Sequence, residues 1–215
     1  LKAFFLSLFC IYYLFDTYPA FESNLEYDES WIKPIISRNL IGTWAICGFW
    51  DWFLYFSPYA KKMKKYKIIP KYPDKRQIFH DFIMTTLSSI IASIFEVGLC
   101  YYWSNNIFFY QKNIYDTPIS NTIWILSLSY WRHVHFYFIH RMMHPWHNGW
   151  HNGWHNRYDI GRFLYKHVHY LHHKSDNPTA FSGTSMHPVE SILYYSVCLV
   201  PVYFGCHPII VVACI

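Results

Sequence analysis

The chain has 215 residues, a length that favours one domain or at most two. Aromatic residues make up 22% of it and charged residues only 14%, whereas typical globular domains carry about 25% charged residues. This balance excludes an intrinsically disordered chain and leaves too little polar surface for an ordinary soluble domain. The formal net charge is +5, and the 14 histidines outnumber the 13 acidic side chains.

Five apolar stretches follow one another along the chain, and their composition predicts helices embedded in a membrane. They are residues 1–15, 35–56, 82–103, 119–139 and 192–215. The last four approach the ~20 residues with which a helix crosses a bilayer. The final stretch contains Pro201 and Pro208, so it is either a span or a re-entrant hairpin. Burial of all these helices inside a large soluble protein is the alternative. We expect an all-α fold, a polytopic membrane helical bundle.

The charges between these stretches predict the orientation of the chain. Residues 16–34 hold five acidic side chains and one lysine, whereas residues 61–79 hold eight basic side chains and one acidic one. The positive-inside rule places the basic loop in the cytosol. A nucleic-acid patch is the other interpretation, but a basic loop between two spans fits lipid headgroups better. Counting crossings from this loop places residues 140–187 on the cytosolic face, as a histidine-rich helical cap.

Two histidine clusters in this cytosolic segment have the spacing of metal ligands. The first is His140-Arg-Met-Met-His144, and the second is His169-Tyr-Leu-His172-His173. On a helix, residues three or four positions apart share a face, so their imidazoles can reach one ion. Clustered imidazoles without thiolates suit iron, zinc, copper or nickel. Five ligands exceed what one tetrahedral structural zinc ion needs, so the sequence predicts a dinuclear centre whose remaining ligands come from elsewhere.

Two further histidines are weaker candidates for the same centre. His133 lies on the same helical stripe as His140, and it is either a ligand, a group that orients a ligand, or an interfacial side chain. His187 precedes Pro188, which suits the first position of a helix, so His187 would cap that helix or bind metal. Glu190 fits the first turn of this helix through the helix dipole alone.

A tandem His-Asn-Gly-Trp unit occupies residues 147–156. Its three histidines could bind metal. The glycines interrupt helical continuity, and a surface spacer is the interpretation that we favour.

The histidine-rich region resembles the fatty acid hydroxylase/sterol desaturase superfamily of membrane-bound di-iron enzymes. The resemblance covers about residues 131–190. The matching segments are His140-Arg-Met-Met-His144, Leu164-Tyr-Lys-His-Val-His169, His169-Tyr-Leu-His-His173, Asn177-Pro-Thr-Ala180 and Met186-His-Pro-Val-Glu190. The resemblance implies that His140, His144, His169, His172 and His173 bind metal, with no catalytic side chain beyond these ligands. Two departures are a missing third histidine box and His133, where many members carry Asp.

The resemblance also implies an activity. The enzyme would be an oxidoreductase of the endoplasmic reticulum that uses O2 and two iron ions, which zinc can replace in purified protein. Electrons would come from NAD(P)H, through cytochrome b5 or its reductase. The substrate would be a membrane lipid that is hydroxylated or desaturated. A reaction like sterol C-5 desaturation is favoured, and a fatty acyl or sphingolipid hydroxylase or an alkylglycerol monooxygenase-like enzyme is the alternative.

Residues 1–118 would then form N-terminal transmembrane helices with the basic loop, and residues 119–215 a catalytic region truncated at its C-terminal end. Without a third box, either the chain continues or its product cannot complete the metal site. The first rival function is therefore a non-catalytic membrane protein with a partial metal site. The second is a metal transporter, which is disfavoured because Asp51 and Glu96 are the only ionisable residues deep in the apolar stretches.

Overall fold

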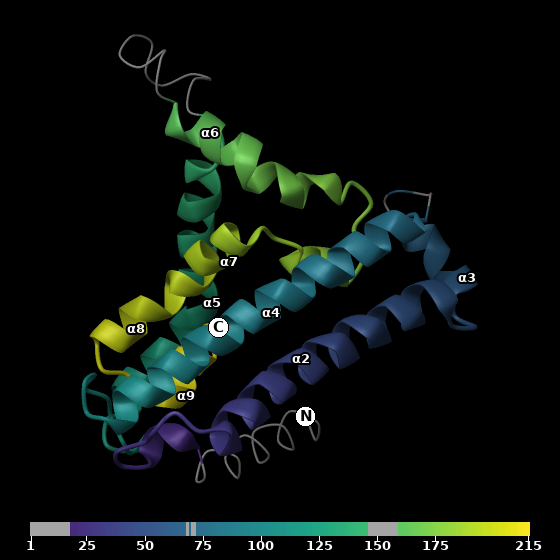
Figure 1. Ribbon diagram of the computed structural model, residues 1–215. Helices are drawn as coiled ribbons and strands as arrows, with labels where there is room; N and C mark the ends of the chain where they lie inside the picture. Colours follow the sequence, from purple (N-terminus) through teal and green to yellow (C-terminus); the bar gives the residue numbers. More distant parts are fainter. Residues whose placement is uncertain (1–17, 68, 70–71, 146–158) are drawn as a thin grey trace. The chain divides into compact units, whose positions relative to one another are not determined.

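The computed structural model describes residues 18–67, 69, 72–145 and 159–215 (Figure 1). Within these residues the chain forms helices and turns and no strand, which confirms the predicted all-α class. The predicted stretch 1–15 and the repeat at 147–156 lie outside the described residues.

The helices are as follows in chain order. They are the 3₁₀ turn Pro19–Phe21, α2 (Glu29–Asp51), the π-helical turn Trp52–Phe56, α3 (Ala60–Met63), the 3₁₀ turn Lys64–Tyr66, α4 (Lys75–Ser104), α5 (Pro118–Met142), α6 (Ile160–His167), the 3₁₀ helix His169–Lys174, the 3₁₀ turn Phe181–Thr184, α7 (Pro188–Tyr195), the 3₁₀ turn Ser196–Cys198, α8 (Leu199–Tyr203) and α9 (Pro208–Val212). The chain divides into two compact units. The first contains the described part of Leu1–Ile35 with Ile94–His133 and Tyr195–Ile215, and the second contains Ile36–Ser93 and Val134–Tyr194. The functional division after residue 118 stays a prediction.

The first unit is built around Trp103 near the end of α4, whose side chain is 1% exposed. The ring of Tyr110 lies 6.0 Å from it, and the Tyr110 hydroxyl donates to the carbonyl of Ala20 at 2.9 Å. The indole of Trp131 donates to the carbonyl of Val197 at 3.0 Å. Each of these hydrogen bonds gives the polar atom of a large aromatic ring a partner inside an apolar core.

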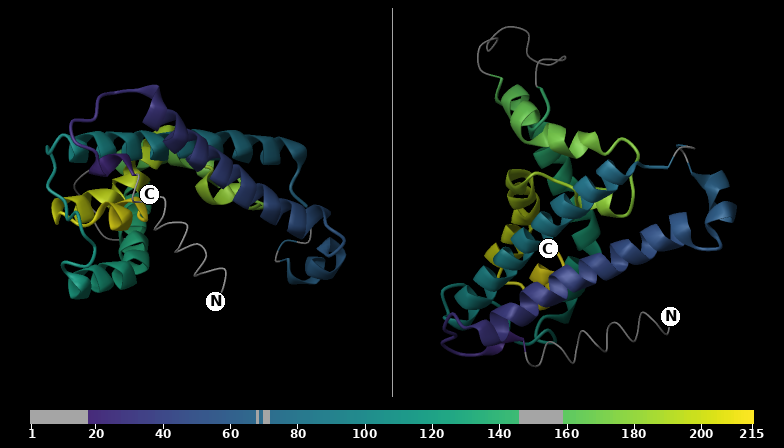
Figure 2. Two further views of the ribbon diagram at one scale, coloured as in Figure 1. Left: turned by 90° about the horizontal axis from the view of Figure 1, so that it is seen from below. Right: turned by 45° about the vertical axis from the view of Figure 1, so that its right-hand side comes forward.

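The second unit contains a close pair of antiparallel helices, α2 and α4 (Figures 1 and 2). Short polar side chains join them. The Ser89 hydroxyl donates to that of Thr43 at 3.1 Å, and the indole of Trp44 donates to the Thr86 hydroxyl at 3.0 Å. Small residues let two helices approach closely, and their hydroxyls then find partners across the contact.

The polar ends of both helices extend beyond the apolar stretches that predict them. The loop predicted over residues 16–34 is wrong in its last six residues, because α2 begins at Glu29. Asp28 accepts a hydrogen bond from the backbone of Ser30 at 2.9 Å, and Asp74 accepts one from that of Gln77 at 2.7 Å. Such contacts satisfy free N–H groups at helix starts, so capping, rather than hydropathy, sets these boundaries.

One described helix, α4, has the length and composition of a membrane span, with 30 residues and a mean hydropathy of 1.7 in its most apolar window. Core helices of soluble proteins meet the same criteria, so the polytopic arrangement stays a prediction. The last predicted stretch is not one continuous helix. It is divided among α7, α8 and α9, with a turn at Gly205, whose φ is +62°.

Candidate metal centre

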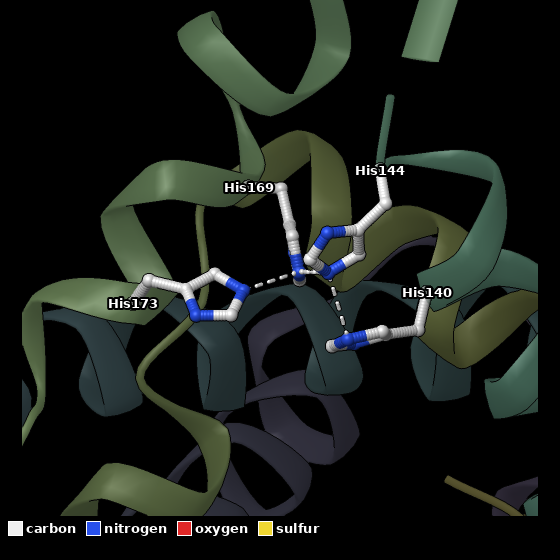
Figure 3. Close-up of side chains that lie close together, drawn as sticks. All are labelled: His140, His144, His169 and His173. Carbon is white, nitrogen blue, oxygen red and sulfur yellow. Dashed lines mark hydrogen bonds between the residues drawn. The ribbon is translucent and has the colours of Figure 1, made fainter. Parts of the chain in front are cut away.

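Four imidazoles converge in the second unit, and each histidine cluster of the sequence contributes two of them. His140 lies in the last turn of α5 and His144 just after that helix, whereas His169 and His173 lie on the 3₁₀ helix His169–Lys174. One ring nitrogen from each lies within 4.8 Å of the others. Figure 3 shows the four rings turned toward one another.

The nitrogens that meet are the Nε2 atoms. The Nε2–Nε2 distance is 3.0 Å between His140 and His144, 3.1 Å between His144 and His169, and 3.0 Å between His169 and His173. Two bare nitrogen lone pairs repel at this separation, so each contact needs a proton or a cation between the rings. Four such donors without a thiolate are typical ligands for iron, zinc, copper or nickel.

The local backbone explains how each cluster presents its rings. At the end of α5, Met143 is fully buried, and the backbone N–H of His144 donates to the carbonyl of Arg141 at 3.3 Å. This last turn keeps His144 beside His140. The second cluster is a 3₁₀ helix rather than the predicted α-helical turn.

His172 is the one predicted ligand that lies outside the converging group. In a 3₁₀ helix, residues three positions apart eclipse one another, so the ring of His172 stacks beside that of His169, with 5.8 Å between centroids and 28° between planes. Its Nδ1 lies 3.3 Å from the carbonyl oxygen of Ser185. The structure therefore brings four of the five predicted ligands together and places His172 next to them.

Glu190 is a site residue that sequence reasoning missed. Its Oε1 lies 2.9 Å from Nδ1 of His169, and the two residues are 1% and 0% exposed. A carboxylate on Nδ1 fixes the proton there and leaves Nε2 of His169 with its lone pair toward the cluster. The helix dipole explains an acid at this position but not its burial. The signal in the sequence is a glutamate at the start of an otherwise apolar helix.

The two weaker candidates lie outside the group of four. Nδ1 of His133 contacts the carbonyl oxygen of Ser129 on its own helix, α5. Nδ1 of His187 accepts a hydrogen bond from the backbone N–H of Val189 at 3.2 Å, so His187 caps α7, as the sequence predicts. Metal binding by either histidine stays a prediction.

Three of the four imidazoles have lowered pKa values. Desolvation, reinforced by the neighbouring imidazoles, lowers the pKa of His140 to about 4. Desolvation and then the proximity of His169 also lower the pKa values of His144 and His173. Neutral imidazole is the form that binds metal, so these rings are ready to coordinate at neutral pH.

These pKa shifts predict how metal binding depends on pH. Because an unperturbed histidine titrates at about 6.5, protons should displace Co²⁺ only at a pH well below that value. The metal-free protein should lose stability as the pH falls from about 6.5 toward 4. In this range the histidines of the unfolded chain bind protons, whereas the histidines with lowered pKa values in the folded chain do not. Equilibrium dialysis with Co²⁺ and thermal unfolding across this range measure both effects. Half-release of Co²⁺ at pH 6.5 would contradict the expectation.

Comparison with family models, with curated proteins and with solved structures found no match to this chain. The candidate centre is therefore defined by the convergence of its imidazoles and by the buried carboxylate behind one of them.

Proposed function

We propose that the protein is an O2-dependent lipid oxidoreductase in which the four converging imidazoles hold part of a di-iron centre. The observation that carries the proposal is the meeting of Nε2 atoms from two separate histidine clusters. One of these ligands, His169, is also oriented by a buried carboxylate. The resemblance of the sequence to fatty acid hydroxylases and sterol desaturases assigns metal binding to the same four residues.

One ring nitrogen from each of the four histidines lies within 4.8 Å of the others, so one ion could contact all four. Imidazoles without a thiolate are ligands that iron and zinc both accept, and iron is the metal that the resemblance to this superfamily implies.

Bound iron would supply the activation of O2, which no protein side chain can provide. The residues of this chain have other tasks. Glu190 keeps Nε2 of His169 unprotonated, and two aromatic rings lie beside the ligands. The ring of Phe136 lies 5.2 Å from that of His140, and the ring of Tyr165 lies 5.2 Å from that of His144. These rings would favour an apolar group of a substrate beside the ligands.

A membrane lipid is the substrate class that the rest of the molecule supports. Helix α4 can span a bilayer. Helix α2 and the turn after it expose large apolar side chains, namely Ile41, Trp44, Ile46, Phe49, Trp50, Trp52 and Phe56. We infer a polytopic protein of the endoplasmic reticulum whose basic segment and histidine centre face the cytosol. Electrons would come from NAD(P)H through cytochrome b5 or its reductase.

The favoured reaction is desaturation of a sterol at C-5, on the strength of the resemblance. Hydroxylation of a fatty acyl chain or sphingolipid, or oxidation of an alkylglycerol, is the alternative within the same chemistry. A non-catalytic membrane protein with a partial metal site is the alternative outside it.

Lipid profiling of cells that express the natural full-length protein tests the proposal. We expect a sterol, acyl or sphingoid species that gains one oxygen atom or loses two hydrogen atoms, and ¹⁸O2 separates the two outcomes. The change should disappear with His169→Ala and persist with His167→Ala, which alters an exposed histidine outside the cluster. Bound metal without any lipid change would favour the non-catalytic alternative instead.

A further inference from the structure

The segment between the second histidine cluster and α7 is held by side chains of α2 and α4. The backbone N–H of Ala180 donates to Asp51 of α2 at 2.7 Å, and the hydroxyl of Thr85 on α4 donates to the carbonyl of Phe181. This segment joins the helix that carries His169 to the helix that carries Glu190. Its placement therefore affects both partners of the carboxylate–imidazole pair.

Asp81 of α4 makes the central contacts with this segment, and its side chain is completely buried. Its carboxylate accepts hydrogen bonds from three serine hydroxyls of the segment: Ser175, Ser182 at 2.6 Å and Ser185 at 2.8 Å. Two longer contacts of 3.3 and 3.4 Å come from side chains of its own helix. A carboxylate only accepts, so every hydroxyl must donate to it, and the three serines are fixed in one arrangement.

One of these serines connects the carboxylate to a histidine. The carbonyl oxygen of Ser185 faces Nδ1 of His172 at 3.3 Å. Because a carbonyl can only accept, it favours the tautomer of His172 that carries its proton on Nδ1. Nε2 of His172 is then the atom with the lone pair, and His172 lies outside the group of four converging imidazoles.

We propose that Asp81 is a positioning residue for the metal centre, which acts through Ser185 on His172 and makes that ring a ligand of the second iron ion. The inference rests on the proposed di-iron function. It assigns two of the three buried carboxylates described in the second unit to two positions of the ion pair. Glu190 orients His169 in the group of four, and Asp81 orients His172 beside it.

A purely structural role for Asp81 is the competing interpretation, and Asp51 supplies the control. Asp51 is also buried, at 8% exposed, and it holds the same segment, but it bonds the backbone of Ala180 rather than Ser185. Asp51→Asn should therefore loosen the segment without changing the acceptor of His172. Asp81→Asn keeps the shape of the side chain but introduces an amide donor in place of an acceptor.

The test measures iron bound per chain, after anaerobic loading of the natural full-length protein, in wild type, Asp81→Asn, Asp51→Asn, His172→Ala and the double variant of Asp81 and His172. Circular dichroism checks that each variant is folded. We expect Asp81→Asn to bind its second ion about 10–100-fold more weakly than wild type, as when other groups behind metal ligands are lost. Asp51→Asn should match wild type. In the His172→Ala background, Asp81→Asn should have no further effect, because the two residues act in one pathway.

The outcomes separate this inference from the proposed function. A wild-type protein without bound iron would overturn both. Wild type with one ion, or with two ions whose affinity Asp81→Asn leaves unchanged, would overturn the positioning role alone. Equal losses in Asp81→Asn and Asp51→Asn, or an undiminished effect of Asp81→Asn without His172, would likewise show that Asp81 only stabilises the fold.

Discussion

Replacing His169 with alanine is expected to abolish metal binding by the group of four imidazoles. Nε2 of His169 lies within 3.1 Å of Nε2 of both His144 and His173, so this atom joins the two histidine clusters. The variant also leaves the carboxylate of Glu190 buried without its partner at 2.9 Å. Loss of a ligand should exceed the 10–100-fold cost of losing a group behind one, and we expect metal affinity to fall more than about 100-fold.

Competition between the protein and a chromophoric chelator for Co²⁺ measures this loss. His167→Ala is the matched control, because His167 is exposed, ends the preceding helix and lies outside the group of four. It should retain wild-type affinity. A His169→Ala protein that is folded and binds Co²⁺ as tightly as the His167→Ala protein would exclude the converging imidazoles as the metal site.

The sequence predicts the helical class and the two histidine clusters because both depend on short-range patterns. Hydropathy indicates where long apolar helices lie, and an i, i+4 spacing brings His140 next to His144 if the local turn is helical. The meeting of the two clusters is a long-range contact, and spacing alone does not determine it. Both clusters offer imidazole ligands, so a shared metal site is the simplest hypothesis. The structure places the Nε2 atoms of the two clusters together.

The buried carboxylates could not be assigned in the same way. Glu190 has a sufficient local explanation in the helix dipole, so nothing in its sequence neighbourhood requires it to reach His169. Asp81 precedes an apolar stretch, and its partners Ser182 and Ser185 follow about a hundred positions later. Serine and aspartate are common at helix ends and in turns, so such a network is visible only after the chain is folded.

The geometry of the second cluster also depends on backbone detail that a sequence pattern does not contain. The segment His169-Tyr-Leu-His-His can form an α-helical or a 3₁₀ turn. The type of turn determines which histidine rings stack on one another. In this 3₁₀ helix His172 stacks beside His169, and Nε2 of His173 lies 3.0 Å from Nε2 of His169. The sequence treats the three histidines as equivalent ligands, whereas the structure gives them different neighbours.

Changing Glu190 should separate metal affinity from the stability of the metal-free fold. Glu190→Gln keeps a carbonyl oxygen that can accept from Nδ1 of His169, but it removes the negative charge that favours a cation at Nε2. Glu190→Ala removes the acceptor as well. We expect metal affinity to fall about 10-fold for the glutamine variant and about 100-fold for the alanine variant.

Without metal, the unfolding temperatures should not follow the order of the metal affinities, because the glutamine variant should be at least as stable as wild type. Oε2 of Glu190 is buried and lacks a hydrogen-bond partner among the described residues. Because an ionised carboxylate costs more to bury than a neutral amide, Glu190→Gln should unfold at the wild-type temperature or slightly above it. Glu190→Ala leaves a cavity and should unfold at a lower temperature. A tenfold weaker affinity would reduce the stabilisation by metal by about 1.4 kcal/mol in the glutamine variant.

Thermal unfolding with and without Co²⁺ measures these effects. Glu96→Gln is the matched control, since Glu96 is also 1% exposed but accepts a hydrogen bond from the Tyr18 hydroxyl at 2.7 Å in the other unit. It should leave the metal-induced shift unchanged. If Glu190→Gln lowered the unfolding temperature of the metal-free protein and left the metal-induced shift intact, Glu190 would be a structural carboxylate. The negative charge of Glu190 would then not contribute to holding a cation at Nε2 of His169.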